Sequence, residues 1–279
     1  MRKRNTLNKY YQFIKGLSGA CKDVARELAY SQERKLLPIN PRHDDVYLVS
    51  FPKSGATWMD FLIANVNIAM SDADRVVTFY NVHQYVPDIH DSRELDTPLL
   101  SFPGFRFIKS HSDLNKYYNN VIYIVRNPGD TMISYYSFLQ GLGRFNGTLS
   151  ELIKSERFGI RSWAKHVESW LFHSPASLAF MMVRYEDLKS DPSSEIERVY
   201  RHLGFSLPQT VLDKAVNLSS FSNMKTLEED LNYGGRPIMD GFQFMRSGQI
   251  GESKAKLSES DKAHIQNGAG HLMERLGYI

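Results

Sequence analysis

Four side chains suited to anion binding or proton transfer each follow a short apolar stretch of the sequence. They are Lys53, Lys109, His111 and Arg126. Lysine and arginine bind phosphate-like groups, and an imidazole with its ordinary pKa of about 6.5 can accept a proton near neutral pH. If the apolar stretches are neighbouring strands, the four side chains meet in one place. The pattern therefore predicts a single site that binds an anionic ligand and contains a base.

The turn that holds Lys53 lies between a predicted strand and a predicted helix. Residues 46–51 form an apolar run rich in β-branched and aromatic residues, and residues 58–70 carry apolar residues at helical spacing. The unpaired N–H groups and the dipole of the first helical turn favour an anion there. Lys53 precedes Gly55, the only glycine of the turn, so the order is not that of a Walker P-loop. An ordinary strand–helix turn is the alternative interpretation.

Three further apolar runs predict three more strands, and the segments between them carry helical signals. The runs cover residues 106–109, 121–125 and 178–183. After the second run, Asn127 suits a helix N-cap and Pro128 the first helical position. This alternation predicts a single α/β domain over residues 1–279, with a central, mostly parallel sheet flanked by helices on both faces. Ligands bind such sheets beyond the carboxyl ends of the strands.

The composition is that of a globular protein and excludes several classes. Hydrophobic residues make up 42% and charged residues 23% of the chain, and the net charge of +3 is too small to indicate nucleic-acid binding. Cys21 is the only cysteine, so neither a disulfide framework nor a cysteine-based metal site is expected. No run of about 18 apolar residues predicts a membrane span. We expect a cytoplasmic protein.

Two segments lie outside the predicted sheet. Residues 1–40 form an N-terminal extension, and residues 7–35 within it predict a helix that interleaves apolar and basic positions. We favour a helix packed on the domain, with contact to a membrane surface as the alternative. Residues 232–255 form a glycine-rich loop that contains Arg246. A loop this long is uncommon inside a domain unless it is a lid or a binding loop, so we expect a lid.

Several segments, taken in chain order, resemble the cytosolic sulfotransferase family. Phe-Pro-Lys-Ser-Gly-Ala-Thr-Trp is similar to the family's 5′-phosphosulfate loop, Tyr-Pro-Lys-Ser-Gly-Thr-Thr-Trp. Lys-Ser-His resembles the family's Lys-Thr-His strand end, and Phe-Met-Arg-Ser-Gly resembles its Arg-Lys-Gly lid. Other segments resemble the pieces that hold the nucleotide 3′-phosphate and the adenine. The segments are residues 51–58, 107–111, 123–136, 183–187 with 219–221, and 244–248, and the resemblance covers roughly residues 46–255.

The resemblance implies a cofactor and a role for each site residue. It implies an enzyme that uses 3′-phosphoadenosine 5′-phosphosulfate (PAPS), without a metal, to sulfate a hydroxyl or amine of a small molecule, with release of adenosine 3′,5′-bisphosphate (PAP). His111 would be the general base, with Lys53 and Lys109 as the other catalytic residues. The implied cofactor-binding residues are Lys53, Ser54, Gly55, Ala56, Thr57, Trp58, Arg126, Ser134, Tyr185, Ser219, Phe221, Phe244, Met245, Arg246, Ser247 and Gly248.

Six aromatic residues are candidates for the acceptor pocket. They are Phe79, Tyr80, Phe102, Phe105, Phe138 and Phe145. They predict an apolar, partly aromatic pocket for a small lipophilic or aromatic acceptor, and plain core packing is the alternative for each of them.

The lid departs from the family pattern, and two other functions stay open. Ser247 and Ser253 stand where lysine and tryptophan are usual, and residues 254–264 hold no clean match to the family's dimer segment, which leaves the oligomeric state open. A nucleotide-binding module without catalysis, regulatory or attached to a membrane surface, is one alternative. A kinase-type phosphotransferase is disfavoured by the missing Walker order. The joint presence of Lys109 and His111 favours the enzyme, because a binding module needs no base.

Overall fold

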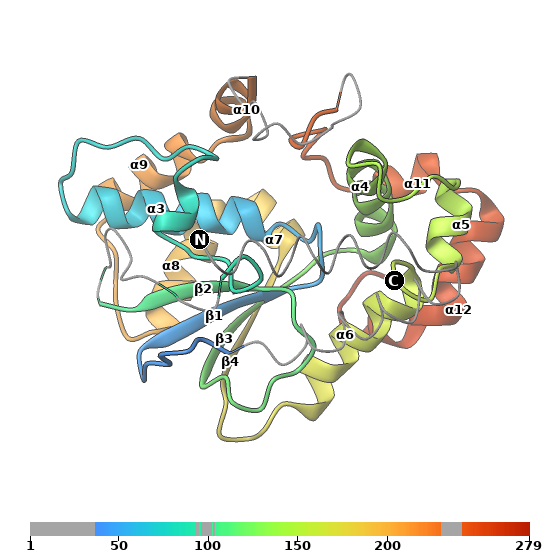
Figure 1. Ribbon diagram of the computed structural model, residues 1–279, viewed down its shortest axis with the longest axis horizontal. Helices are drawn as coiled ribbons and strands as arrows, with labels where there is room; N and C mark the ends of the chain where they lie inside the picture. Colours follow the sequence, from blue (N-terminus) through green and yellow to red (C-terminus); the bar gives the residue numbers. More distant parts are fainter. Residues whose placement is uncertain (1–36, 93–94, 96–101, 103, 230–241) are drawn as a thin grey trace, which may run out of the picture.

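The protein is described by a computed structural model that covers residues 37–92, 95, 102, 104–229 and 242–279. Its centre is a sheet of four strands, all parallel, in the order β2-β1-β3-β4 (Figure 1). The strands are β1 (Asp45–Ser50), β2 (Arg106–Ser110), β3 (Asn120–Val125) and β4 (Ala179–Arg184). Each matches a predicted strand to within one or two residues at its ends.

Helices cover both faces of the sheet, as Figure 1 shows. One face carries α3 (Ala56–Met70), α8 (Pro192–His202) and α9 (Gln209–Leu218). The other carries α4 (Pro128–Gly141), α5 (Leu149–Lys154), α6 (Ile160–His173) and α12 (Glu259–Arg275). Shorter elements are η1 (Val82–Gln84), α7 (Tyr185–Ser190), α10 (Phe221–Glu229) and α11 (Glu252–Lys256). The predicted fold class is confirmed.

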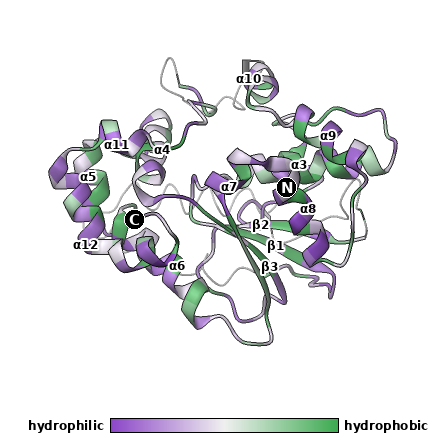
Figure 2. Ribbon diagram, turned by 180° about the vertical axis from the view of Figure 1, so that it is seen from behind, coloured by the Kyte–Doolittle hydropathy of each residue, from purple (hydrophilic) through white to green (hydrophobic). Residues whose placement is uncertain are grey.

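The alternation of side chains along each strand produces two separate hydrophobic cores. In β1, Val46 and Leu48 belong to the core under α3, whereas Tyr47 and Val49 belong to the core under α6 and α12. Successive residues of a strand point to opposite faces, so a strand covered on both sides is apolar throughout. Figure 2 shows this as hydrophobic colouring concentrated in the strands of the sheet.

Local helix signals in the sequence are confirmed where the structure describes them. The Asn127 side chain accepts hydrogen bonds from the backbone N of Gly129 and Asp130, and Pro128 is the first residue of α4. The predicted helix over residues 7–35 and the predicted lid residues 232–241 lie outside the described residues. In the portion of the chain that is described, no helix is both long and apolar enough to cross a membrane.

The strand order places a crevice at the carboxyl end of the sheet. β1 lies between β2 and β3, and the chain leaves β1 into α3 on one face and β3 into α4 on the other. Where consecutive connections diverge to opposite faces, a gap opens that ligands occupy in such folds. Lys53 follows β1 and Arg126 follows β3, so both stand at this gap.

Candidate active site

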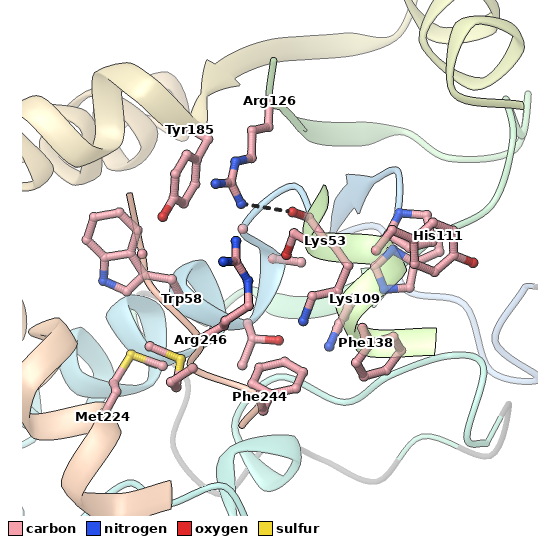
Figure 3. Close-up of a pocket in the computed structure, with 18 of the residues that line it drawn as sticks. Lys53, Trp58, Lys109, His111, Arg126, Phe138, Tyr185, Met224, Phe244 and Arg246 are labelled. Carbon is pink, nitrogen blue, oxygen red and sulfur yellow. Dashed lines mark hydrogen bonds between the residues drawn. The ribbon is translucent and has the colours of Figure 1, made fainter. Parts of the chain in front are cut away.

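A cavity of about 490 Å³ lies beyond the carboxyl ends of the strands. Its walls come from the turn after β1, the end of β2, α4, the start of α7, α10 and residues 244–248 (Figure 3). Two of the expected cofactor-binding residues, Ser54 and Ser219, are fully buried and do not line it. The expected site residues that do line it are Lys53, Gly55, Ala56, Thr57, Trp58, Lys109, His111, Arg126, Ser134, Tyr185, Phe221, Phe244, Met245, Arg246, Ser247 and Gly248.

The turn between β1 and α3 presents backbone and hydroxyl donors. Lys53 and Gly55 both adopt positive φ angles, of 68° and 109°. Gly55 is the N-cap of α3 and no side chain caps this helix end, so the first-turn N–H groups and the helix dipole can act on an anion. The buried Oγ of Ser54 has no hydrogen-bond partner among the described residues. A buried hydroxyl is normally paired, so this donor suits a ligand oxygen.

Lys53 carries a charge that its surroundings disfavour. Its Nζ lies 3.7 Å from the centroid of the Phe244 ring and 4.5 Å from that of Phe138. Burial, with added repulsion from Lys109 and Arg126, lowers the pKa of Lys53 to about 7. A bound anion would offset these effects, because a nearby negative charge stabilises the ammonium form.

Lys109, in contrast, is paired with two carboxylates. Its Nζ lies 3.4 Å from Oδ2 of Asp60, in α3, and 3.7 Å from Oδ2 of Asp88. Burial alone would lower the pKa of Lys109, but attraction to Asp60 and Asp88 outweighs it and raises the pKa above its ordinary value. Burial in turn raises the pKa of Asp60 to about 6. Because its own pKa is raised, Lys109 keeps its positive charge at neutral pH.

His111 is held as a neutral base. Its Nδ1 lies 2.8 Å from the backbone oxygen of Ser50. A carbonyl oxygen only accepts hydrogen bonds, so Nδ1 carries the proton and Nε2 keeps its lone pair. Burial, with repulsion from Lys109, lowers the pKa of His111 to about 3. The imidazole is therefore neutral near pH 7, and its free lone pair can take a proton from a molecule in the cavity.

Two arginines from different elements supply further positive charge. Nη2 of Arg126 donates to the backbone oxygen of Gln249 at 2.8 Å, and the guanidinium lies 4.3 Å from the centroid of the Tyr185 ring. The guanidinium of Arg246 pairs with the carboxylate of Glu252, and this hydrogen bond is the main cause that lowers the pKa of Glu252 to about 2. Nε of each arginine is buried with no hydrogen-bond partner in the described chain.

The Glu252 carboxylate organises the Arg246 side of the cavity. Ser247 stands where the family usually has lysine, and its Oγ donates to this carboxylate at 3.0 Å. Nζ of Lys256 donates to it at 2.7 Å. Arg246 and Ser247 are thus held by one carboxylate that does not itself line the cavity.

Aromatic rings form the end of the cavity that lies away from His111 (Figure 3). The rings of Trp58 and Tyr185 meet at 5.9 Å between centroids, at an angle of 68°. A Cβ atom on Gly55 would lie 2.6 Å from the Tyr185 ring, and one on Gly248 would lie 2.6 Å from the Phe221 ring. Glycine at both positions therefore lets the backbone rest against the rings, which gives this end flat walls suited to a planar group.

The sulfotransferase domain family matches residues 43–277 of this chain. The chain belongs to the sulfotransferase family. It is 30% identical over 236 residues to Sulfotransferase 1B1 of the dog, covering 76% of this chain and 78% of that protein. It is 28% identical over 246 residues to mouse Sulfotransferase 1 family member D1, covering 78% and 79%. The family and the enzyme class predicted from the sequence are confirmed.

A solved structure confirms the fold of this sulfotransferase. The crystal structure of retinol dehydratase in complex with retinol and PAP superposes with a TM-score of 0.66 at 18% identity. The match covers 88% of this chain and 85% of that one. The likeness therefore supports the fold described above, a parallel sheet covered by helices on both faces.

The six aromatic residues expected around the acceptor lie in different places. Phe138 lines the cavity, whereas Phe79 does not but contacts the ring of Phe244, which does, at 5.9 Å between centroids. The others do not line the cavity: Phe102 and Phe105 pack against Phe205, Phe145 packs against Tyr136 and Phe158, and Tyr80 is half-exposed. Large rings bury more apolar area against other rings than on a cavity wall, which favours the packed positions of Phe102, Phe105 and Phe145.

Polar residues that the sequence analysis did not single out also line the cavity of this sulfotransferase. They are Asp88, His90, Asp91, Ser112 and Arg144, and Lys189 lies near the aromatic end. The segment that holds Asp88 and His90 shows no periodic pattern, so its pairing with β2 was not predictable. Asp60 did give a signal, because it is the one charged residue of α3, and a carboxylate buried in a largely apolar helix requires a partner.

Replacing Gly55 with alanine tests how closely the turn approaches Tyr185. Alanine at a positive φ costs on the order of 1 kcal/mol, and here its Cβ would also collide with the ring. We expect Gly55→Ala to lower the free energy of unfolding by at least 1 kcal/mol more than Gly204→Ala, as an order-of-magnitude estimate. Gly204 is the matched control, because its φ is 86° and its Cβ would meet nothing within 4 Å. Equal losses in urea denaturation would contradict the close approach.

Proposed function

We propose that this enzyme transfers the sulfuryl group of PAPS to a hydroxyl or amine of a small acceptor, with His111 as the general base and PAP as the second product. The observation that carries the proposal is the neutral imidazole whose Nε2 is free, placed in one cavity with two lysines and an uncapped helix N-terminus. A module that only binds a nucleotide needs the cations but not the base.

The residues at the cavity fit PAPS. The 5′-phosphosulfate would lie on the turn, where the Ser54 hydroxyl is buried without a partner among the described residues. The 3′-phosphate would lie between Arg126 and Arg246, whose forked donors suit phosphate oxygens, with Ser134 on the same wall. The adenine would occupy the flat-walled end formed by Trp58 and its neighbours. The PAP named in the retinol dehydratase structure supports the assignment by analogy.

Each catalytic side chain has a defined task in the proposed transfer. Nε2 of His111 takes the proton of the acceptor hydroxyl or amine as the acceptor's new bond to sulfur forms. The bond between sulfur and the bridging oxygen of the phosphosulfate breaks, and its electron pair leaves with the phosphate of PAP. Lys53 and Lys109 stabilise the charge on the bridging oxygen and on the transferring group. Because two lysines can meet this charge, the proposal calls on no metal ion.

The acceptor is proposed to be a small molecule with both apolar and polar parts. Phe138 and Leu139 of α4 give the cavity apolar contacts near His111, while Asp88 and Ser112 offer hydrogen bonds. The sequence predicted an apolar, partly aromatic pocket, and the polar groups beside it were not expected. Retinol and androsterone, named with retinol dehydratase, belong to the lipophilic hydroxyl compounds that we would screen first. We also propose a cytoplasmic location, in line with the single cysteine.

Calorimetric titration with PAP tests the cofactor, with ATP and adenosine 5′-monophosphate as controls. We expect PAP to bind with a Kd in the micromolar range or below and the controls at least about tenfold more weakly, because only PAP engages both arginines with its 3′-phosphate. A preference for ATP would contradict the proposal and would favour the kinase-type phosphotransferase.

The same titration repeated at several pH values tests the state of Lys53. In the free enzyme the pKa of Lys53 is about 7, and the bound anion raises it, so the complex holds more protons than the free enzyme above pH 7. PAP affinity should therefore fall as the pH rises from 7 to 9, by up to about tenfold per pH unit. The Lys53→Gln variant should bind more weakly and lose this slope. An unchanged slope in the variant would show that another group titrates.

Replacing His111 with alanine tests the base. Loss of a general base typically lowers kcat by about 10²- to 10⁴-fold. We expect a loss in this range for His111→Ala in a radiolabelled PAPS assay, with a PAP dissociation constant within about threefold of the wild type, because His111 lies at the end away from the aromatic rings. His271→Ala, at an exposed histidine of α12, is the control. Near-normal turnover of His111→Ala would remove the imidazole from its role.

A further inference from the structure

A short segment after η1 pairs with the outer edge of the sheet beside the catalytic residues. β2 is an edge strand by the strand order, and Asp88 forms an isolated parallel bridge with Lys109. The backbone N of Lys109 donates to the oxygen of Pro87 at 2.9 Å, and the N of Ile89 donates to the oxygen of Lys109 at 3.1 Å. Residues 87–89 thus continue the sheet next to the strand that carries the lysine.

The pairing brings two side chains of this segment beside two catalytic side chains. Asp88 lies opposite Lys109 in the bridge, and the turn that follows it brings His90 beside His111. All four line the cavity. Asp88 pairs with Lys109, and the rings of His90 and His111 lie 5.8 Å apart at an angle of 24°.

The side chain of His90 accepts a hydrogen bond from the backbone N–H of His111. The backbone N of His111, one residue past the end of β2, donates to Nε2 of His90 at 2.8 Å. His90 is itself held, because its backbone N donates to Oδ1 of Asp88 at 2.9 Å. The ring of His111 is fixed separately by its Nδ1 contact with Ser50. Two hydrogen bonds, one to the backbone and one to the ring, therefore determine where Nε2 of His111 lies.

We propose that His90 is a positioning residue for the transfer step: its Nε2 holds the backbone of His111, so that the imidazole of His111 meets the acceptor at the required place. The inference rests on the function proposed above. His90 takes no proton in the reaction, because its Nε2 is occupied by the His111 amide. Displacement of a reacting group by about 1 Å can cost about 10²-fold in rate, so loss of this hydrogen bond should lower kcat far more than it affects nucleotide binding.

Three variants separate positioning from a general structural role. In His90→Ala the acceptor atom is lost, whereas in His90→Gln the side-chain oxygen can still accept from the His111 amide. His83→Ala, at an exposed histidine of η1 in the same segment, is the matched control. With PAPS and 4-nitrophenol as substrates, we expect His90→Ala to lower kcat by about 10- to 100-fold. His90→Gln should recover most of that loss, and His83→Ala should match the wild type.

Two kinetic outcomes would overturn the inference. One is a kcat for His90→Ala within about twofold of the wild type. The other is a higher KM for 4-nitrophenol with unchanged kcat, which would make His90 a contact for the acceptor. The PAP dissociation constant, measured by calorimetry for all variants, should stay within about threefold. A parallel loss of PAP affinity and kcat would indicate collapse of the site and would also count against positioning.

Hydrogen exchange tests the same contact without any turnover. The amide of His111 should exchange slowly in the wild type and in His90→Gln, and at least about tenfold faster in His90→Ala, since an unbonded amide at a strand end opens more readily. If the wild type binds PAP but sulfates no acceptor, the proposed function fails while this measurement still decides the positioning contact. Equal protection of the His111 amide in wild type and His90→Ala would refute it.

Discussion

The site depends on the crowding of positive charges in a place largely removed from water. Lys53, Lys109, Arg126 and Arg246 face one cavity, and their mutual repulsion adds to the burial that lowers the pKa of Lys53. Each cation has a different kind of partner. Lys53 lies over aromatic rings, and Lys109 pairs with two carboxylates. Arg126 contacts a backbone oxygen and a ring, and Arg246 pairs with one carboxylate. A ligand with several negative charges is the natural complement of this arrangement, because it relieves repulsion that the protein alone leaves in place.

The sheet makes the crowding possible. Parallel strands bring their carboxyl ends to one edge, and the divergence of the chain after β1 and β3 opens the space above them. The same geometry separates the charges by function. The arginines, Trp58 and Tyr185 stand toward one end of the cavity, Lys53 and Lys109 stand between the two ends, and His111 stands at the other end (Figure 3). Burial and repulsion from Lys109 both lower the pKa of His111, so its imidazole stays neutral.

Sequence reasoning succeeded where a few neighbouring residues decide the structure. The N-cap at Asn127 and the turn at residues 51–58 depend on local backbone chemistry, so both were predictable. The partners of Lys109 were not, because Asp60 and Asp88 reach it from a helix and a loop that only the folded chain brings together. The acceptor wall was hardest to predict, since a phenylalanine such as Phe105 gives the same sequence signal in a core as in a pocket.

The division of the interior into two cores determines which parts of the cavity wall can change independently of each other. Trp58, Met224 and Tyr185 line the cavity from α3 and from elements packed on its core, whereas Phe138 and Leu139 line it from α4, on the other core. The sheet stands between them as a partition. Substitutions in one core can therefore reshape one wall of the cavity while the packing behind the opposite wall stays as it is.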